Sequence, residues 1–531
     1  MLLYNYTIIT FGCQYDEMEG KIFMLKKITR VLPALLLLLG LIGPMAQASP
    51  KSEISLDIYS VNDLRGALRK ESDYPGVAEL GGVIKTLRAE NPNGTILLGG
   101  GNMLFGTIES DDRNGMPTVE AMNLMGFDAN VTGSHFFDFK PDIFKEQLAI
   151  AKFPYLACNV EVKTGTPLFK PYTILERNGL KVGVIGVTTR TTLREASPAN
   201  LANFTFIDSV TSTQKAIDEV RRQGANVVVL LMHCGVNQRA ADGALRGEAI
   251  DILSRLKGAD VCFTGDSQTL VTGRYNDIPV LQAGSHGRYI AKVHLIYDSD
   301  SKKVLTKREE MIVVANAPAP EDQAIANLVA PIAQAVDAKF GQVLAYNEKA
   351  LTNHRDDQST VAEYLTDLMR KDSKADFVII NGGAFRSDMP EGKVTARTIE
   401  EIYPYRGQAV LMSMKGIDIL AALDYGVDNP LVGEGRYSGI KLAVEPDLGP
   451  GEKIVDNVLP NGDKIDPNKE YTVLTNSYMA QGGDGYTMFK NGKQLKVVAP
   501  DIKAYLRGLV QDAGTINYTT DYRFSVGELR G

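Results

Sequence analysis

Cysteine is scarce in this sequence, with four residues in 531. After the first fifty residues only Cys158, Cys234 and Cys262 remain, and neither a CxxC pair nor any other spacing suggests a disulfide framework. Each lies in an apolar or glycine-flanked run, "YLACNV", "VVLLMHCG" or "DVCFTG", which is typical of buried inert thiols. A reactive or metal-binding thiol is the alternative interpretation. An odd count leaves at least one thiol unpaired.

Basic clusters and long apolar runs are also missing after residue 50. The net charge is −7, and no basic block offers a surface to phosphate backbones, so nucleic acid is not expected as a partner. No later run approaches the ~20 apolar residues of a membrane-spanning helix. We also find no internal repeat and no low-complexity tract. The sequence therefore predicts a soluble mature chain, long enough for two domains.

The N-terminus has the pattern of an export signal. Residues 24–48 combine a basic start, "MLKKITR", with an apolar run, "VLPALLLLLGLI", and a small-residue site, "AQA". This pattern predicts a secretory signal peptide, cleaved after Ala48, and a periplasmic or extracellular location. The polar, mixed stretch before Met24 makes Met24 a candidate start codon, in which case residues 1–23 are not translated and Cys13 is absent from the working protein. A retained membrane anchor is the alternative.

The rest of the chain alternates strand-like and helix-like segments. Short β-branched runs such as "GTILLGGGN" and "ANVVVLLMHCG" end in polar residues, and helix-like pieces lie between several of them. This predicts an α/β layered domain over residues 49–314, with its site at the carboxyl ends of the strands. A Pro-rich entry followed by an Ala-rich pattern predicts a linker helix at 315–344. A second domain, of α+β type, is then expected at 345–531.

Four motifs in order resemble one family. "MNLMGFDANVTGSHFFD", "NGGAFRSDMPEGKVT", "YPYRGQAV" and "SYMAQGGDGY" are similar to those of secreted 5′-nucleotidases, which include bacterial periplasmic UDP-sugar hydrolases. The resemblance covers nearly all of residues 53–531. It implies a metallophosphoesterase domain, a linker helix and a C-terminal domain that recognises a nucleotide or nucleotide sugar.

The resemblance also implies a two-metal centre, holding Mn, Zn, Mg or Ca in relatives. Four of seven ligand positions are changed here: a histidine is Arg65, the bridging aspartate is Asn102, an asparagine is Ser134 and a histidine is Asp266. The matching positions that can still offer a ligand atom are Asp63, Asn102, Ser134, His233, Asp266 and Gln268.

The bridging change has the largest electrostatic consequence. A carboxylate shared by two dications offsets their repulsion with a full charge, whereas the Asn102 amide offers only a dipole. Arg65 adds a guanidinium that is always protonated and cannot coordinate a metal. We therefore expect no dinuclear centre, and at most one cation or none, with His233 as its retained ligand.

His135 and Asp138 match the family's catalytic dyad, in which a carboxylate orients an imidazole that faces the substrate phosphate. Phe136 stands where relatives usually have glutamate. A purely structural role for the pair is the alternative.

The C-terminal half keeps most positions that the resemblance assigns to the nucleotide. Two arginines suit phosphate, one asparagine and one aspartate suit base or ribose, and two tyrosines suit stacking on the base. The predicted substrate-binding residues are Arg355, Asn381, Arg386, Tyr405, Tyr478 and Asp484. Departures from the family are Leu351, Arg406 and Gly407. Helix capping by Arg386 and core packing by the tyrosines remain alternatives.

Three functions follow as hypotheses. The first is a monomeric nucleotide-binding relative whose phosphoesterase centre is impaired. The second is an active hydrolase of nucleotide phosphoesters that uses one metal or Arg65. The third is a structural surface protein that retains only the fold.

Overall fold

A computed structural model describes residues 52–138, 141–165, 167–196, 198–238, 243–355, 357–429 and 433–529. The predicted signal peptide lies outside these residues. Glu53–Gly531 form one compact unit. Among the described residues, no helix is both long and apolar enough to cross a membrane.

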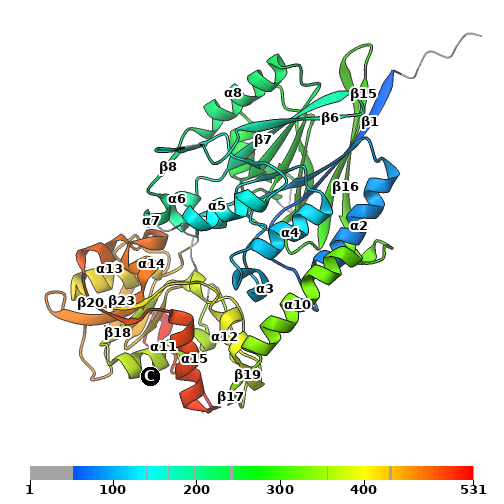
Figure 1. The fold of residues 1–531 in the computed structure, drawn as a ribbon. Coiled ribbons are helices and arrows are strands. Elements are labelled where there is room, and N and C mark those ends of the chain that lie inside the picture. The colour runs from blue at the N-terminus through cyan, green and yellow to red at the C-terminus, as the bar shows by residue number, and fades with distance from the viewer. Residues whose placement is uncertain are drawn as a thin grey trace, which may run out of the picture. The chain divides into compact units, whose positions relative to one another are not determined.

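Two six-stranded sheets form the N-terminal half (Figure 1). The first, in order, contains β16 (Lys303–Val313), β15 (Tyr289–Asp298), β1 (Glu53–Val61), β2 (Thr95–Gly99), β3 (Ala129–Val131) and β4 (Tyr155–Leu156). The second contains β13 (Leu270–Tyr275), β14 (Ile278–Ala283), β12 (Val261–Thr264), β9 (Val227–His233), β7 (Leu180–Thr188) and β6 (Tyr172–Arg177). Two short pairs are β5 (Val160–Val162) with β8 (Phe204–Phe206), and β10 (Asn237–Gln238) with β11 (Leu245–Arg246).

The central strands of both sheets run parallel. β1, β2, β3 and β4 pair in parallel, as do β7, β9, β12 and β14. All seven residues of β9, "VVVLLMH", are buried, as expected for a strand covered on both faces. Apolar side chains from both sheets make a shared core. The parallel strands therefore end together at one edge, where the polar residues collect.

Helices cover the outer faces of these sheets. α2, α4 and α10 pack against one another beside the first sheet, and α8 packs on β7 and β9 of the second (Figure 1). The bounds are α2 (Gly76–Glu90), α3 (Ile108–Asp111), α4 (Met116–Met125), α5 (Pro141–Ile150), α6 (Thr192–Glu195), α7 (Pro198–Leu201), α8 (Ser209–Arg222) and α9 (Glu248–Leu253). Short 3-10 turns are η2 (Ser134–Asp138) and η3 (Val314–Asn316).

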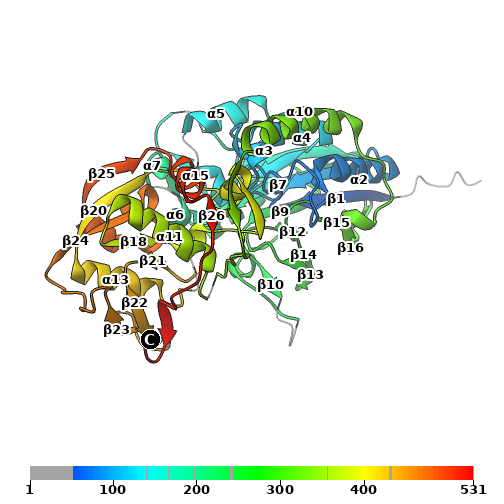
Figure 2. The same cartoon turned by 90° about the horizontal axis from the view of Figure 1, so that it is seen from below.

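The C-terminal half is α+β, drawn in yellow to red (Figure 2). Its main sheet has the order β21 (Arg436–Ser438), β18 (Phe377–Ile380), β24 (Glu470–Asn476), β20 (Ala409–Lys415) and β25 (Lys493–Ala499). Two smaller sheets are β19 (Gly392–Thr395), β17 (Val343–Asn347) and β26 (Thr515–Ile516), and β23 (Ile454–Val458), β22 (Lys441–Val444) and β27 (Phe524–Val526). Its helices are α11 (Thr360–Ser373), α12 (Ala396–Ile402), α13 (Gly416–Gly426), α14 (Ser477–Ala480) and α15 (Ile502–Ala513), with turns η4 (Gly382–Ala384), η5 (Gly483–Gly485) and η6 (Thr487–Asn491).

One helix, α10 (Gln323–Phe340), belongs to both halves. Asp322 caps its first turn by accepting from the backbone N–H groups of Ala324 and Ile325. Ile325 packs in the N-terminal core, whereas Val336 and Phe340 pack in the C-terminal core. The helix predicted in this segment is present, and it joins two hydrophobic cores.

The mixed, layered α/β fold expected from the sequence is confirmed by this architecture. The expected burial of Cys158, Cys234 and Cys262 is also observed. Burial raises the pKa of Cys262 to about 12, which keeps it a thiol. In the run "YLACNV", Cys158 lies between the short strands β4 and β5, and its backbone N–H donates to the Gly186 carbonyl at 2.8 Å.

Candidate functional site at the strand ends

The strand ends of the N-terminal half hold their polar residues on unusual backbone. Asp63, Arg65, Asn102, Asp266 and Gln268 all have positive φ, between 48° and 79°. Residues other than glycine rarely adopt this region of φ, although asparagine and aspartate do so more often than the rest. Such conformations persist where the surrounding structure imposes them, typically at functional sites. These five residues form what we call the corner. Its backbone keeps a conformation typical of functional sites, although several of its side chains differ from the family pattern.

His233, at the end of β9, is completely buried. Its Nδ1 lies 2.7 Å from the Gly100 carbonyl, so Nδ1 is the donor and Nε2 carries the lone pair. Nε2 has no hydrogen-bond partner among the described residues and lies 3.6 Å from Oδ1 of Asp266. A Cβ on Gly101 would stand 2.3 Å from Nδ1, so the glycine permits this close packing. The imidazole is fixed with an unused acceptor, as in a metal-ligating histidine.

Asp63 is buried on the loop after β1. Its Oδ2 accepts from Asn62 and from the backbone N–H of Asp266, both at 2.9 Å, whereas Oδ1 lacks a partner in the described part of the chain. Asp266 is half-buried. Burial, followed by the nearby carboxylates of Glu195, Asp63 and Glu248, raises the pKa of Asp266 to about 8. The corner thus gathers carboxyl groups, and burial beside other carboxylates favours the protonated form of Asp266.

Asn102 braces the neighbouring loop. Its Oδ1 accepts from the backbone N–H of His135 at 3.0 Å, and its Nδ2 lies 3.4 Å from Oγ of Ser134. Gly133 allows this approach, since a Cβ there would stand 2.1 Å from Oδ1 of Asn102. The amide oxygen is already used by the fold, which leaves it poorly suited to bridge two cations.

Arg65 brings a fixed positive charge to the same corner. Its Nε is buried and has no hydrogen-bond partner among residues the structure describes. Burial, and then the Arg65 charge, lowers the pKa of His286 to about 4, so this imidazole stays neutral. No group of three or more His, Cys, Asp or Glu side chains in the described ranges is arranged to hold a metal ion. The residues present do not fit a pair of dications.

His135 and Asp138, the two residues of the predicted dyad, are hydrogen-bonded to each other. Nδ1 of His135 lies 2.7 Å from Oδ2 of Asp138 on the turn η2. This hydrogen bond orients the ring through Nδ1 and does not use Nε2. Phe136 points the other way, into an aromatic cluster where it stacks on Phe144 at 4.7 Å between ring centroids. The change to phenylalanine therefore anchors the turn.

In the C-terminal half, three predicted residues form one network at η5. Asp484 accepts from Nδ2 of Asn381 at 2.7 Å and lies 2.7 Å from the Tyr478 hydroxyl. Asn381 in turn accepts from Asn476 at 3.1 Å. Burial is the largest cause of a raised pKa for Asp484. These groups converge from the end of β18, from α14 and from η5 into one hydrogen-bonded network.

The two predicted arginines lie on neighbouring loops. Arg386 donates from Nε to the Tyr405 hydroxyl at 3.0 Å, and its guanidinium lies 5.4 Å from that ring's centroid. Arg355 lies exposed on the 352–359 loop, of which residues 352–355 and 357–359 are described. Asn353 ties the loops together by donating to the Phe385 carbonyl at 3.1 Å and, through its backbone, to Asp388 at 2.6 Å. The hydroxyl groups of Tyr405 and Tyr478 each have a polar partner.

The polar groups of the two halves meet at α6. The Tyr478 hydroxyl lies 2.9 Å from the Arg194 carbonyl, and α6 packs on both η2 and η5. The Glu195 carboxylate contributes to the raised pKa of both Asp266 and Asp484. Sequence reasoning missed α6, because "TTLREA" carries no recognisable motif. It also missed His286, which stacks on Tyr74 beside the corner.

Comparison with known proteins defines the class of this two-domain fold. Residues 332–491 match the family described as "5'-nucleotidase, C-terminal domain". A 5′-nucleotidase precursor from Thermus thermophilus has the same fold, with a TM-score of 0.77, 24% identity and coverage of 89% of this chain and 99% of that one. A putative 5′-nucleotidase from Staphylococcus aureus superimposes with a TM-score of 0.74 at 20% identity, over 89% and 100% of the two chains.

Curated relatives agree. The chain is 26% identical to a 5′-nucleotidase of Vibrio cholerae over 84% of this chain and 88% of that protein. It is 26% identical to protein UshA of Yersinia enterocolitica over 74% and 78%. It is also 26% identical to endonuclease YhcR of Bacillus subtilis over 91% of this chain, but spans only 42% of that protein's length. Residues 332–491 thus match the family's C-terminal domain, and the chain as a whole is similar to 5′-nucleotidases in sequence and fold.

Proposed function

We propose that this protein binds a nucleotide or nucleotide sugar through its C-terminal half, outside the cytoplasm, as a monomer with an impaired phosphoester-hydrolysing centre. Support for export comes from the signal-peptide pattern at residues 24–48. Support for the ligand comes from the family and from the hydrogen-bonded set of Asn381, Tyr478 and Asp484.

The network at Asp484 is the observation that carries this proposal. Its carboxylate is held in place by two side chains from different elements, so little conformational entropy is lost when it accepts hydroxyl groups of a ribose. Arg386 and Arg355 on the adjoining loops offer forked donors for phosphate. Stacking on Tyr405 would supply affinity that does not depend on the base.

Isothermal calorimetry with adenosine, AMP and UDP-glucose tests this proposal. We expect binding of at least one phosphorylated ligand, and a rise in stability of about 2.7 kcal/mol at 100 times its dissociation constant. Asp484→Asn should weaken binding at least about tenfold, a loss of about 1.4 kcal/mol, because a ribose acceptor is lost. Asp512→Asn, at an exposed position, is the matched control. Absence of binding by every ligand would favour a scaffold role.

Hydrolysis with one cation is the second candidate function. Asp63 Oδ1 and His233 Nε2 are buried atoms without partners in the described chain, and they would be its protein ligands. A divalent cation bound there would polarise a phosphoryl oxygen and lower the pKa of a bound water. The ordered pair of His135 and Asp138 would face the phosphate or hold a proton at Nε2 of His135.

Metal analysis paired with turnover of AMP and UDP-glucose separates the two candidates. We expect fewer than two bound metal ions per chain and little or no turnover. One ion with turnover would favour the second candidate, and two ions with turnover would refute an impaired centre. The quadruple variant Arg65→His, Asn102→Asp, Ser134→Asn, Asp266→His should increase metal binding, because it restores the family's ligand types.

A further inference from the structure

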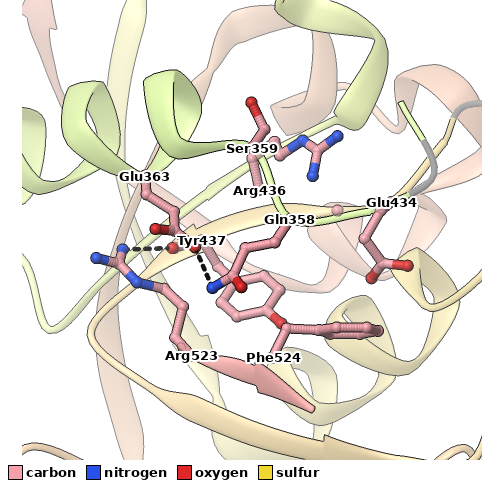
Figure 3. A pocket seen from close by; sticks show the side chains of 9 residues that line it. Gln358, Ser359, Glu363, Glu434, Arg436, Tyr437, Arg523 and Phe524 are labelled. Carbon is pink, nitrogen blue, oxygen red and sulfur yellow. Dashed lines mark hydrogen bonds between the residues drawn. The ribbon is translucent and has the colours of Figure 1, made fainter. Parts of the chain in front are cut away.

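A buried polar cluster lies beneath the loop that carries Arg355. It lines a small cavity, with about 20 Å³ for the centres of water molecules, which is room for about one water and too little for a metabolite (Figure 3). Arg436 and Glu434 belong to this lining, and each is 5% exposed. Charged side chains are almost never buried to this extent unless they are paired. Arg436 and Glu434 are therefore expected to have close polar partners.

The Arg436 guanidinium is bonded to the backbone of the 352–359 loop. Its Nη1 donates to the carbonyl of Asp357 at 2.7 Å, and its Nη2 donates to the carbonyls of His354 and, at 3.2 Å, Arg355. One planar cation thus gathers three carbonyls of the segment that presents Arg355. Charge-assisted donors in a fixed fork restrict a loop more strongly than neutral hydrogen bonds do.

Neighbouring backbone reinforces this contact. Glu434 donates its backbone N–H to the Arg355 carbonyl at 2.8 Å. Gly433 has φ of +77°, and a Cβ there would stand 2.7 Å from the Arg355 carbonyl oxygen. Burial lowers the pKa of Arg436, and the Glu434 carboxylate, when ionised, partly offsets this by favouring the charged guanidinium. The 433–436 segment is therefore shaped to fit the loop.

The backbone of Arg436 is held in place by strand pairing. It pairs with Ile380 across β21 and β18, and β18 ends directly before Asn381. The same residue thus connects the strand that presents Asn381 to the loop that presents Arg355. If Asn381 recognises the nucleoside and Arg355 its phosphate, the distance between these two side chains depends on Arg436.

We propose that Arg436 is a positioning residue for phosphate recognition: its buried guanidinium holds the 352–359 loop so that Arg355 faces the phosphate of a bound nucleotide. This inference rests on the proposed function. Arg436 itself is buried and contacts no ligand. Its effect should therefore appear only in the part of the affinity that the phosphate contributes, and only while Arg355 is present.

A double-mutant cycle tests this, with AMP and adenosine as probes of the full chain. Arg355→Met should lower the AMP affinity at least about tenfold and leave adenosine affinity within about threefold. Arg436→Met should have a similar selective effect. In the Arg355→Met background it should add less than about threefold, because both changes remove the same interaction. Arg436→Lys, which keeps the charge, should restore part of the AMP affinity and is used if the methionine variant fails to fold.

Arg523→Met is the matched control. Arg523 lines the same cavity and is also 5% exposed, but it donates to Asp367 and to the Tyr437 carbonyl instead of the loop. It should lower the unfolding temperature without changing the ratio of AMP to adenosine affinity. Equal losses for both probes in Arg436→Met, or additive losses in the double variant, would overturn the positioning role. If Arg355→Met leaves AMP affinity unchanged, phosphate binding by Arg355 is refuted instead.

Discussion

The buried carboxyl group of Glu434 should make the free energy of unfolding depend on pH. Its side chain is buried, and its Oε1 has no hydrogen-bond partner among the described residues. Burial, partly offset by the backbone N–H of Asp428 and by the charges of Arg436 and Lys453, raises its pKa from 4.5 to about 7. The charged groups that face it are therefore not sufficient to compensate the lost hydration.

The sign follows from linkage. Because the folded state holds the Glu434 proton more tightly than the unfolded chain, the folded state binds more protons between pH 4.5 and pH 7. Stability must fall as the pH rises through this window, and the loss is complete above pH 7. A pKa that moves from 4.5 to about 7 corresponds to about 3 kcal/mol, at about 1.4 kcal/mol per pH unit.

Urea unfolding of the wild type and Glu434→Gln at pH 5, 6, 7 and 8 measures this effect. Glutamine keeps an acceptor for Asp428 and cannot titrate. Relative to the variant, the wild type should lose about 2–3 kcal/mol between pH 5 and pH 8, because a small part of the effect falls below pH 5. Glu452→Gln, at an exposed position, should run parallel to the wild type. Parallel curves for Glu434→Gln would show that this carboxyl is not desolvated, and a loss in the opposite direction would show that Arg436 stabilises its charged form.

Three further predictions concern other close contacts. Glu109 is 3% exposed and pairs with Arg397 across the two halves. Glu109→Gln should lower the free energy of unfolding by about 2–4 kcal/mol, because Arg397 then loses its buried partner. An unchanged urea midpoint would contradict this. Gly101→Ala should displace His233, since its Cβ would stand 2.3 Å from that ring and φ is +86°. A lower melting temperature is expected, whereas Gly179→Ala, where nothing lies within 4 Å, isolates the cost of positive φ alone. Gly433→Ala should weaken AMP binding more than adenosine binding in calorimetry, and an equal change for both would indicate general unfolding of the loop.

The predictable part of this molecule is local. Runs such as "ANVVVLLMHCG" place strands and their polar ends because backbone geometry gives alternating or fully apolar patterns distinct meanings. The pair of His135 and Asp138 is three residues apart, so one turn suffices to bring the two side chains together. The motifs that resemble the family added the positions predicted to bind a nucleotide, and three of them, Asn381, Tyr478 and Asp484, lie together in the fold.

Residues that act across the fold had no such signal. Tyr478 and Arg194 are 284 positions apart, and only packing of η5 on α6 joins them. Arg436 and Glu434 read as ordinary charges within "GEGRYSG", yet they are buried beneath a loop about 80 residues earlier.

The amino-acid sequence by itself determined the strands, the buried thiols and the types of side chain at the strand ends, because these depend on near neighbours and on hydrophobicity. Tertiary structure alone decided which charges are removed from water and which carbonyls or carboxylates then compensate them. The physical reason is that desolvation depends on everything packed around a group, and the sequence order does not specify those neighbours.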